Sequence, residues 1–139
     1  MSLDPDLAEL VDALVADAID ALPEPVLRRL EEVPVVLLDE PDPRMASDVG
    51  LDLAVARDEL CGLHSGIALT ARTIEETAAP DVIHLFRRGL LLRADDLAAE
   101  QPGAVFEDVL AAEIAVTLLH ELGHHFGLDE NDLERLGYA

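Results

Sequence analysis

Residues 105 to 125 restrict the possible fold more than any other segment, because nothing in them interrupts a helix except Gly123. Most of the segment is Ala, Val, Leu and Ile, which predicts a helix buried on nearly every side. At about 100° per residue, five polar side chains fall within one arc of roughly 100°. They are Glu113, Thr117, His120, Glu121 and His124. An unpaired buried polar group costs about 1–3 kcal/mol, so this arc needs a metal ion, a hydrogen-bond network or a water-filled cleft.

The rest of the sequence supplies enough apolar residues to bury such a helix. The chain has 139 residues, of which 50% are hydrophobic, and this is the size and composition of one domain. With no Trp, one Tyr and three Phe, the core must be mainly aliphatic. Neither a repeat nor a linker divides the sequence, so residues 1–139 are predicted to form a single domain.

The charge of the chain limits its partners. Acidic residues outnumber basic ones 30 to 9, and the formal net charge is −21 at pH 7. Such a surface repels phosphate, so we expect neither nucleic acid nor an anionic membrane as a partner. No signal-peptide pattern and no apolar run of about 20 residues is present. Cys61 is the single cysteine and is expected in the core, which favours a reducing, cytoplasmic setting. The oligomeric state stays open, a homodimer included.

Upstream of residue 105, the apolar pattern predicts an α+β domain with two helices and three strands. Asp4 is the expected N-cap of the first helix and Pro5 its first residue. The strand at 60–69 carries two glycines, which is typical of an edge or bulged strand. The full prediction is helices at 4–22 and 26–32, strands at 33–38 (buried), 60–69 and 81–88, a loop at 39–48, irregular structure at 70–80, and a polar helix or loop at 93–103.

The helix at 105–125 ends in the sequence HELGH. His120 and His124 are four residues apart, so they lie one turn apart on one face and both imidazoles can converge on one ion. Glu121 is rotated away from His120 and can reach a water bound to that ion. HExxH on a helix therefore indicates two zinc ligands with a general base between them. We predict one Zn²⁺ ion held by His120 and His124, with Glu121 as the catalytic base.

A catalytic zinc site usually has three protein ligands and a water. Gly127 can adopt a positive φ and turn the chain back at the end of the helix. Asp129 and Glu130 follow that turn, and either carboxylate can reach the ion. Only 15 residues follow His124 in this sequence, so we expect no ligand from a distant downstream helix.

The extended pattern HExxHxxGxxE at residues 120–130 resembles that of the zincin metallopeptidases. In zincins whose motif ends in His or Asp, that last residue is the third ligand, which implies Glu130 here and Asp129 as its competitor. Glutamate departs from the usual pair, and its extra methylene changes its reach. Across nearly its whole length the chain also resembles the small bacterial zincin-like metallopeptidases, or minimal zincins. The matching stretches are VPVVLLDEPDP, LCGLHSGIALT, DVIHLFRRGLL and LLHELGHHFGLDENDLERLG.

This resemblance implies both a fold and an activity. The implied fold is a short mixed sheet packed on an N-terminal helix and on a buried active-site helix. The implied activity is peptide-bond hydrolysis, in which zinc lowers the pKa of its water from about 15.7 to near 7 and polarises the scissile carbonyl. Glu121 would take the proton of that water and pass it to the leaving amine. The peptide is expected along an edge strand, for which residues 60–69 are the candidate.

Three further polar residues each have two interpretations. Glu113 and Thr117 either hold the imidazole of a zinc ligand in position without binding the ion themselves, or line the cleft. Tyr138 is either an oxyanion donor or a packed terminal residue.

The remaining histidines are interpreted outside the ligand set. His125 points about 100° away from His124, so it either supports the site or is partly exposed. His64 and His84 fall in predicted strands and are assigned structural roles. Asp129 or Asn131 can also cap a short helix at 131–136.

The sequence is compatible with three functions. The first is a zinc peptidase acting on a peptide or protein. The second is a zincin-like binding or regulatory module with weak or no hydrolysis, which the small size favours. The third is a metal-dependent ribonuclease, which the net charge of −21 and the Glu121 base oppose. We expect the first.

Overall fold

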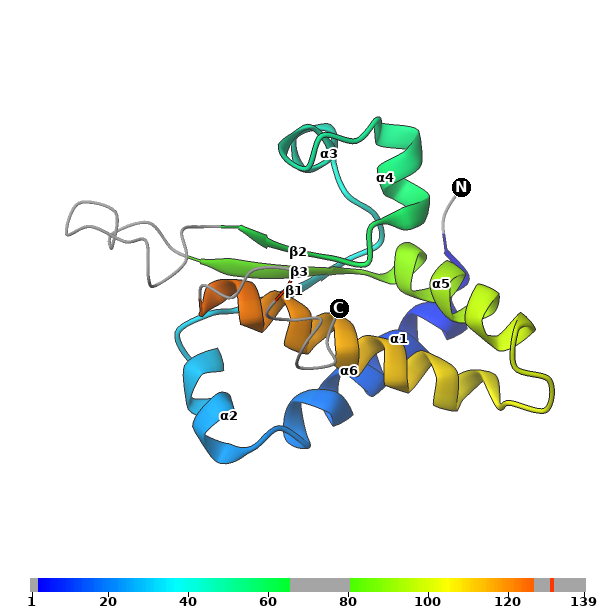
Figure 1. The fold of residues 1–139 in the computed structure, drawn as a ribbon, viewed down its shortest axis with the longest axis horizontal. Helices are drawn as coiled ribbons and strands as arrows, with labels where there is room; N and C mark the ends of the chain where they lie inside the picture. Colours follow the sequence, from blue (N-terminus) through cyan, green and yellow to red (C-terminus); the bar gives the residue numbers. More distant parts are fainter. Residues whose placement is uncertain (1–2, 66–80, 127–130, 132–139) are drawn as a thin grey trace.

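The computed structural model describes residues 3–65, 81–126 and 131 of the 139. Figure 1 shows a small sheet with helices on both sides of it. In chain order the elements are α1 (Pro5–Asp20), α2 (Glu24–Leu30), β1 (Val35–Leu38), α3 (Pro43–Asp48), α4 (Leu53–Glu59), β2 (Gly62–Ser65), β3 (Val82–Phe86), α5 (Arg87–Ala99) and α6 (Phe106–His125). Within these ranges, no helix combines the length and apolar character that crossing a bilayer requires.

The described strands form a mixed sheet in the order β1-β3-β2. β1 runs parallel to β3, with Val35 opposite Ile83, whereas β2 runs antiparallel to β3, with His64 opposite Ile83. The expected α+β fold with a short mixed sheet is therefore confirmed. Strand β2 lies at one edge of this sheet, as predicted for residues 60–69, of which 66–69 lie outside the described residues.

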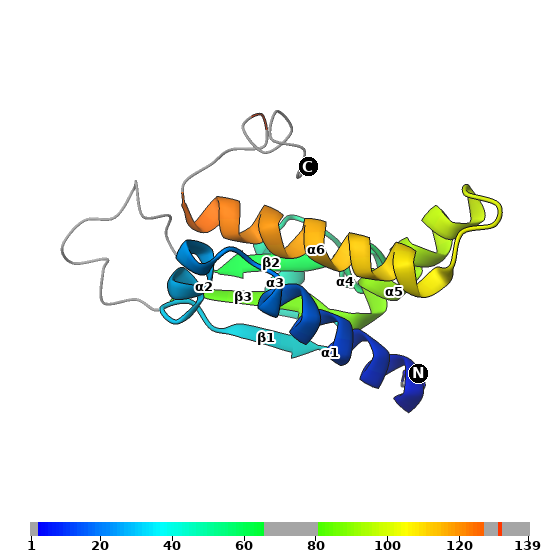
Figure 2. The same ribbon diagram turned by 90° about the horizontal axis from the view of Figure 1, so that it is seen from below.

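Helix α6 packs beneath the sheet, and α1 lies beside it on the same side (Figure 2). Ile83 and Leu85 of β3, Ile114 and Leu118 of α6 and Val11 of α1 are each 0% exposed and belong to one core. Burying a side chain of this size stabilises the fold by roughly 1.5–3 kcal/mol. The predicted helix at 105–125 is thus confirmed, and the core fixes the position of the HELGH segment.

The start of α1 follows its sequence signals. The Asp4 side chain accepts the backbone N–H of Asp6 at 2.8 Å, and Pro5 occupies the first helical position. An N-cap oxygen satisfies one of the N–H groups that a helix start leaves without a partner.

The loop predicted at 39–48 is wrong in its second half, where α3 forms. The Asp42 side chain accepts the backbone N–H of Met45 at 2.8 Å, and Pro43 takes the first helical position. Asp and Pro are common in turns, but the same two residues also start helices.

The strand predicted at 81–88 ends at Phe86, and α5 begins at Arg87. Of the stretch predicted as a polar helix or loop at 93–103, residues 93–99 are therefore the second half of α5, and 100–103 are a turn beyond its end. A Cβ on Gly89 would stand 2.1 Å from the carbonyl oxygen of Leu60, so only glycine lets α5 begin so close to the end of α4. The expected burial of 33–38 is also wrong in part, because β1 lies at the other edge of the sheet and Val36 is 37% exposed.

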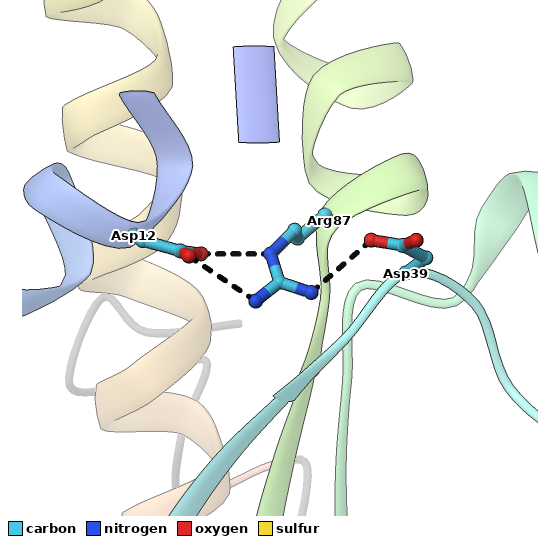
Figure 3. Close-up of polar contacts among 3 residues, drawn as sticks. All are labelled: Asp12, Asp39 and Arg87. Atoms are coloured by element: carbon cyan, nitrogen blue, oxygen red, sulfur yellow. Dashed lines mark hydrogen bonds and ion pairs between the residues drawn. The ribbon is translucent and has the colours of Figure 1, made fainter. Parts of the chain in front are cut away.

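Arg87 joins three elements at the start of α5 (Figure 3). Its Nε and Nη2 donate to the two carboxylate oxygens of Asp12 in α1 at 2.7 and 3.2 Å, and its Nη1 donates to Asp39 after β1 at 3.1 Å. These hydrogen bonds, those to Asp12 above all, raise the pKa of Arg87 further above its ordinary value. A bidentate guanidinium–carboxylate contact fixes the relative orientation of the two side chains as well as the distance between them.

Candidate metal centre

His120 and His124 meet at the C-terminal end of α6. Their Nε2 atoms lie 3.0 Å apart and their ring centroids 4.7 Å apart. A carboxylate oxygen of Glu121 and one ring nitrogen of each histidine all lie within 4.8 Å of one another. The structure thus brings together the three residues that the HELGH spacing predicts.

The arrangement fits a zinc ion. Two nitrogens that are each about 2.0–2.1 Å from one ion lie roughly 3 Å apart, close to the separation found here. Without an ion, the same contact is a hydrogen bond between one protonated and one unprotonated nitrogen. Glu121 is buried, with 8% exposure, and its position beside both rings suits a base that acts on a water at the ion rather than on bulk solvent.

Strand β2 packs at Gly62 against the face of α6 that carries Thr117 and Glu121. A Cβ on Gly62 would stand 2.9 Å from Cγ2 of Thr117 and 3.1 Å from Cγ of Glu121. Thr117 is buried and packs its methyl group against β2. This packing tests neither of its two predicted roles.

Glu113 lies two turns before Glu121 on α6 and is half-buried. It lines a cavity of about 450 Å³ between the end of α5 and the first half of α6, together with Leu97 and Val105. This cavity includes none of His120, Glu121 and His124, so it tests neither of the two predicted roles of Glu113. Burial raises the pKa of the Cys61 thiol to about 12, and the negative charge of Glu113 adds to the effect. Cys61 packs against the core, as expected.

His125 is not partly exposed, and that alternative is wrong. Its side chain is 2% exposed, and its Nδ1 contacts Oδ2 of Asp81. His64 of β2 reaches the same carboxylate, with Nε2 at 3.4 Å from Oδ2 of Asp81. Burial lowers the pKa of His64 below its ordinary value, against the opposing influence of Asp81. We call His64, Asp81 and His125 the buried His-Asp-His cluster.

Asp81 is not among the site residues that the sequence predicts. Its available signal was an acidic residue beside the apolar strand VIHLF, with Pro80 before it. A charged residue at that place is ordinarily solvated, and only the packing of β2 and α6 makes it a buried partner. His84 has the structural role assigned to it, since its ring stacks on Phe86 with centroids 6.3 Å apart.

Several predicted site residues lie outside the described residues. These are the third-ligand candidates Glu130 and Asp129, and Tyr138. The helix predicted at 131–136 is described only at Asn131, which is helical. The prediction of irregular structure at 70–80 also falls outside the described ranges.

A mixed sheet over a helix that carries two converging histidines and a buried glutamate defines a zincin-like domain. The sequence profile of the zincin-like metallopeptidases matches residues 30–138 of the chain, which is most of its length. The protein therefore belongs to the zincin-like metallopeptidase family, and the resemblance inferred from the sequence is confirmed. A comparison with curated proteins finds no match. Membership of this family implies zinc binding, and the donor set of His120, Glu121 and His124 is consistent with it.

Proposed function

We propose that this protein is a zinc-dependent peptidase in which His120 and His124 hold the ion and Glu121 is the general base. The observation that carries the proposal is the 3.0 Å approach of the two Nε2 atoms with the buried Glu121 carboxylate beside them. Two ligand nitrogens and a carboxylate free of bulk solvent are the parts that metal-assisted peptide hydrolysis needs.

Each residue has a distinct task in this proposal. When bound, zinc supplies Lewis acidity, which acidifies a coordinated water and polarises a carbonyl oxygen. Glu121 accepts a proton from the attacking water and donates it to the departing amine nitrogen. The buried setting of Glu121 keeps competing water away from this transfer.

The proposed substrate is an extended peptide that adds to the sheet. Strand β2 is an edge of the described sheet, and it lies over Thr117 and Glu121. A peptide paired with such an edge gains backbone hydrogen bonds along its length and passes next to the catalytic base. Affinity would then depend mainly on the backbone of the substrate, with side chains adding selectivity.

For the third zinc ligand we propose Glu130, with Asp129 as the alternative. Each is changed singly to its amide, and the zinc dissociation constant is measured by competition with a chromogenic chelator. Loss of one carboxylate ligand should weaken zinc binding by at least about tenfold. Unchanged affinity in both variants would exclude both residues.

The activity is tested with tag-free protein and a library of unstructured peptides. Peptides should be cleaved by the zinc-loaded protein, not by the chelator-treated protein, and again after zinc is restored. If zinc binds stoichiometrically but no peptide is cleaved, the peptidase proposal fails, and a zincin-like binding or regulatory module takes its place. Absence of zinc binding at His120 and His124 would contradict the metal site itself.

A further inference from the structure

The buried His-Asp-His cluster lies outside the HELGH ligand set. It brings together side chains from β2, from the residue before β3, and from the end of α6. One ligand atom from each of His64, Asp81 and His125 falls within 4.8 Å of the other two. The ring centroids of the two histidines are 5.7 Å apart, compared with 4.7 Å for His120 and His124.

The cluster is almost completely shielded from water. The side chains of His64, Asp81 and His125 are 7%, 2% and 2% exposed. Among the described residues, Nε2 of His64 and Nε2 of His125 have no hydrogen-bond partner, although the former lies 3.4 Å from Asp81. His125 faces Asp81 through Nδ1, so the unpartnered nitrogen beside this carboxylate is Nε2 of His64. Buried polar atoms ordinarily have a partner, which points to a ligand between His64, Asp81 and Nδ1 of His125.

The donor atoms of the cluster indicate which kind of ligand it can bind. Two imidazoles and a carboxylate form a set of nitrogen and oxygen donors that zinc and similar divalent ions prefer. A divalent cation would also be attracted to the buried carboxylate of Asp81. An anion, by contrast, would place a second negative charge next to that carboxylate.

We propose that His64, Asp81 and His125 form a second metal site, which binds Zn²⁺ and fastens β2 and β3 to the end of α6. His124 and His125 are neighbours that point about 100° apart on the helix, so the two sites lie on different sides of α6. The second ion is structural: it holds the edge strand over the helix end that carries the catalytic ligands. This inference does not depend on peptidase activity.

The test counts zinc ions per chain. Tag-free protein is loaded with zinc, freed of excess by gel filtration, and analysed by native mass spectrometry and elemental analysis. Wild-type protein should carry two ions, and the His120→Asn/His124→Asn variant should keep one. Adding His64→Asn to that variant should remove the remaining ion and abolish the rise in melting temperature that zinc produces. As a matched control, His84→Asn should keep both ions, since His84 lies in neither cluster.

The possible outcomes separate this inference from the proposed function. If folded His120→Asn/His124→Asn protein carries no zinc, the second site does not exist. The same conclusion follows if the ion that this variant keeps survives the addition of His64→Asn. Should wild-type protein carry one ion that is lost with His64→Asn but kept by the His120→Asn/His124→Asn variant, the second site stands and the proposed catalytic centre fails. The first of these counts uses His120→Asn/His124→Asn protein, which retains the whole buried cluster, so that count does not depend on a substitution in the core.

Discussion

Gly62 of the edge strand lies so close to Glu121 of helix α6 that a Cβ on Gly62 would stand 3.1 Å from Cγ of Glu121. The same Cβ would stand 2.9 Å from the methyl group of Thr117. Contacts this short displace one of the partners. The absence of a side chain at position 62 therefore sets how closely the edge strand approaches the proposed general base.

The variant Gly62→Ala should lower both peptide cleavage and the free energy of unfolding, the latter by about 1–3 kcal/mol, because overpacking shifts Thr117 and Glu121. Adding Thr117→Ser removes the methyl group at the closest contact and should restore part of both losses. Gly50→Ala is the control: Gly50 has φ +74° with nothing within 4 Å of its Cβ position, so it should lose stability only. Equal effects of Gly62→Ala and Gly50→Ala on cleavage would contradict this account.

Replacing Arg87 by Lys should destabilise the protein by about 1 kcal/mol, because lysine cannot reproduce the two-pronged contact with Asp12. The figure is modest because the Asp12 side chain is 44% exposed. Urea unfolding measures it, and a double-mutant cycle with Asp12→Asn isolates the pair. The exposed pair Arg28–Glu24 provides a control, and Arg28→Lys should have almost no effect. Equal destabilisation by the two substitutions would show that the Arg87 contact has no special role.

The stability of the protein should decrease as the pH falls below about 6.5. Burial lowers the pKa of His84 in the folded state below its ordinary value of 6.5, with Asp42 opposing the shift. Between the two pKa values the unfolded chain binds more protons, so its free energy falls relative to that of the folded state. The stabilisation that neutral His84 contributes is fully present above its pKa in the unfolded chain. It is lost as the pH falls through its lower pKa in the folded protein.

The variant His84→Gln tests this assignment by urea unfolding at several pH values. Its stability should depend less steeply on pH below 6.5 than that of the wild type. Some dependence should remain, because burial also lowers the pKa of His64. Identical slopes for variant and wild type would show that His84 does not contribute.

Cys61 should resist alkylation in the folded protein. Its pKa is raised to about 12, chiefly by burial, so almost no thiolate forms at mildly alkaline pH. At about pH 8.5, iodoacetamide should modify the folded protein on the order of a hundredfold more slowly than the urea-unfolded chain. Mass spectrometry follows the modification at this single cysteine. Equal rates in the two states would mean that the thiol is neither buried nor shifted.

The residues of the candidate metal centre are predictable from the sequence because local periodicity determines their geometry. His120, Glu121 and His124 lie on one continuous helix, so their spacing alone places them together. Asp42 and Pro43 show the limit of local signals, because the same pair is compatible with a turn and with a helix start. The buried His-Asp-His cluster shows a different limit. Its three residues are far apart in the sequence, and only the pairing of β2 with β3 over α6 brings them together.

Glu121→Gln provides the most direct test of the central claim that Glu121 is the base of a zinc site formed by His120 and His124. The amide keeps the shape of the side chain but cannot accept the proton. Zinc content and peptide cleavage are measured on the same tag-free preparations of variant and wild type. The account predicts unchanged zinc content and a loss of cleavage of at least about a hundredfold. Cleavage at the wild-type rate by zinc-loaded Glu121→Gln protein would contradict it.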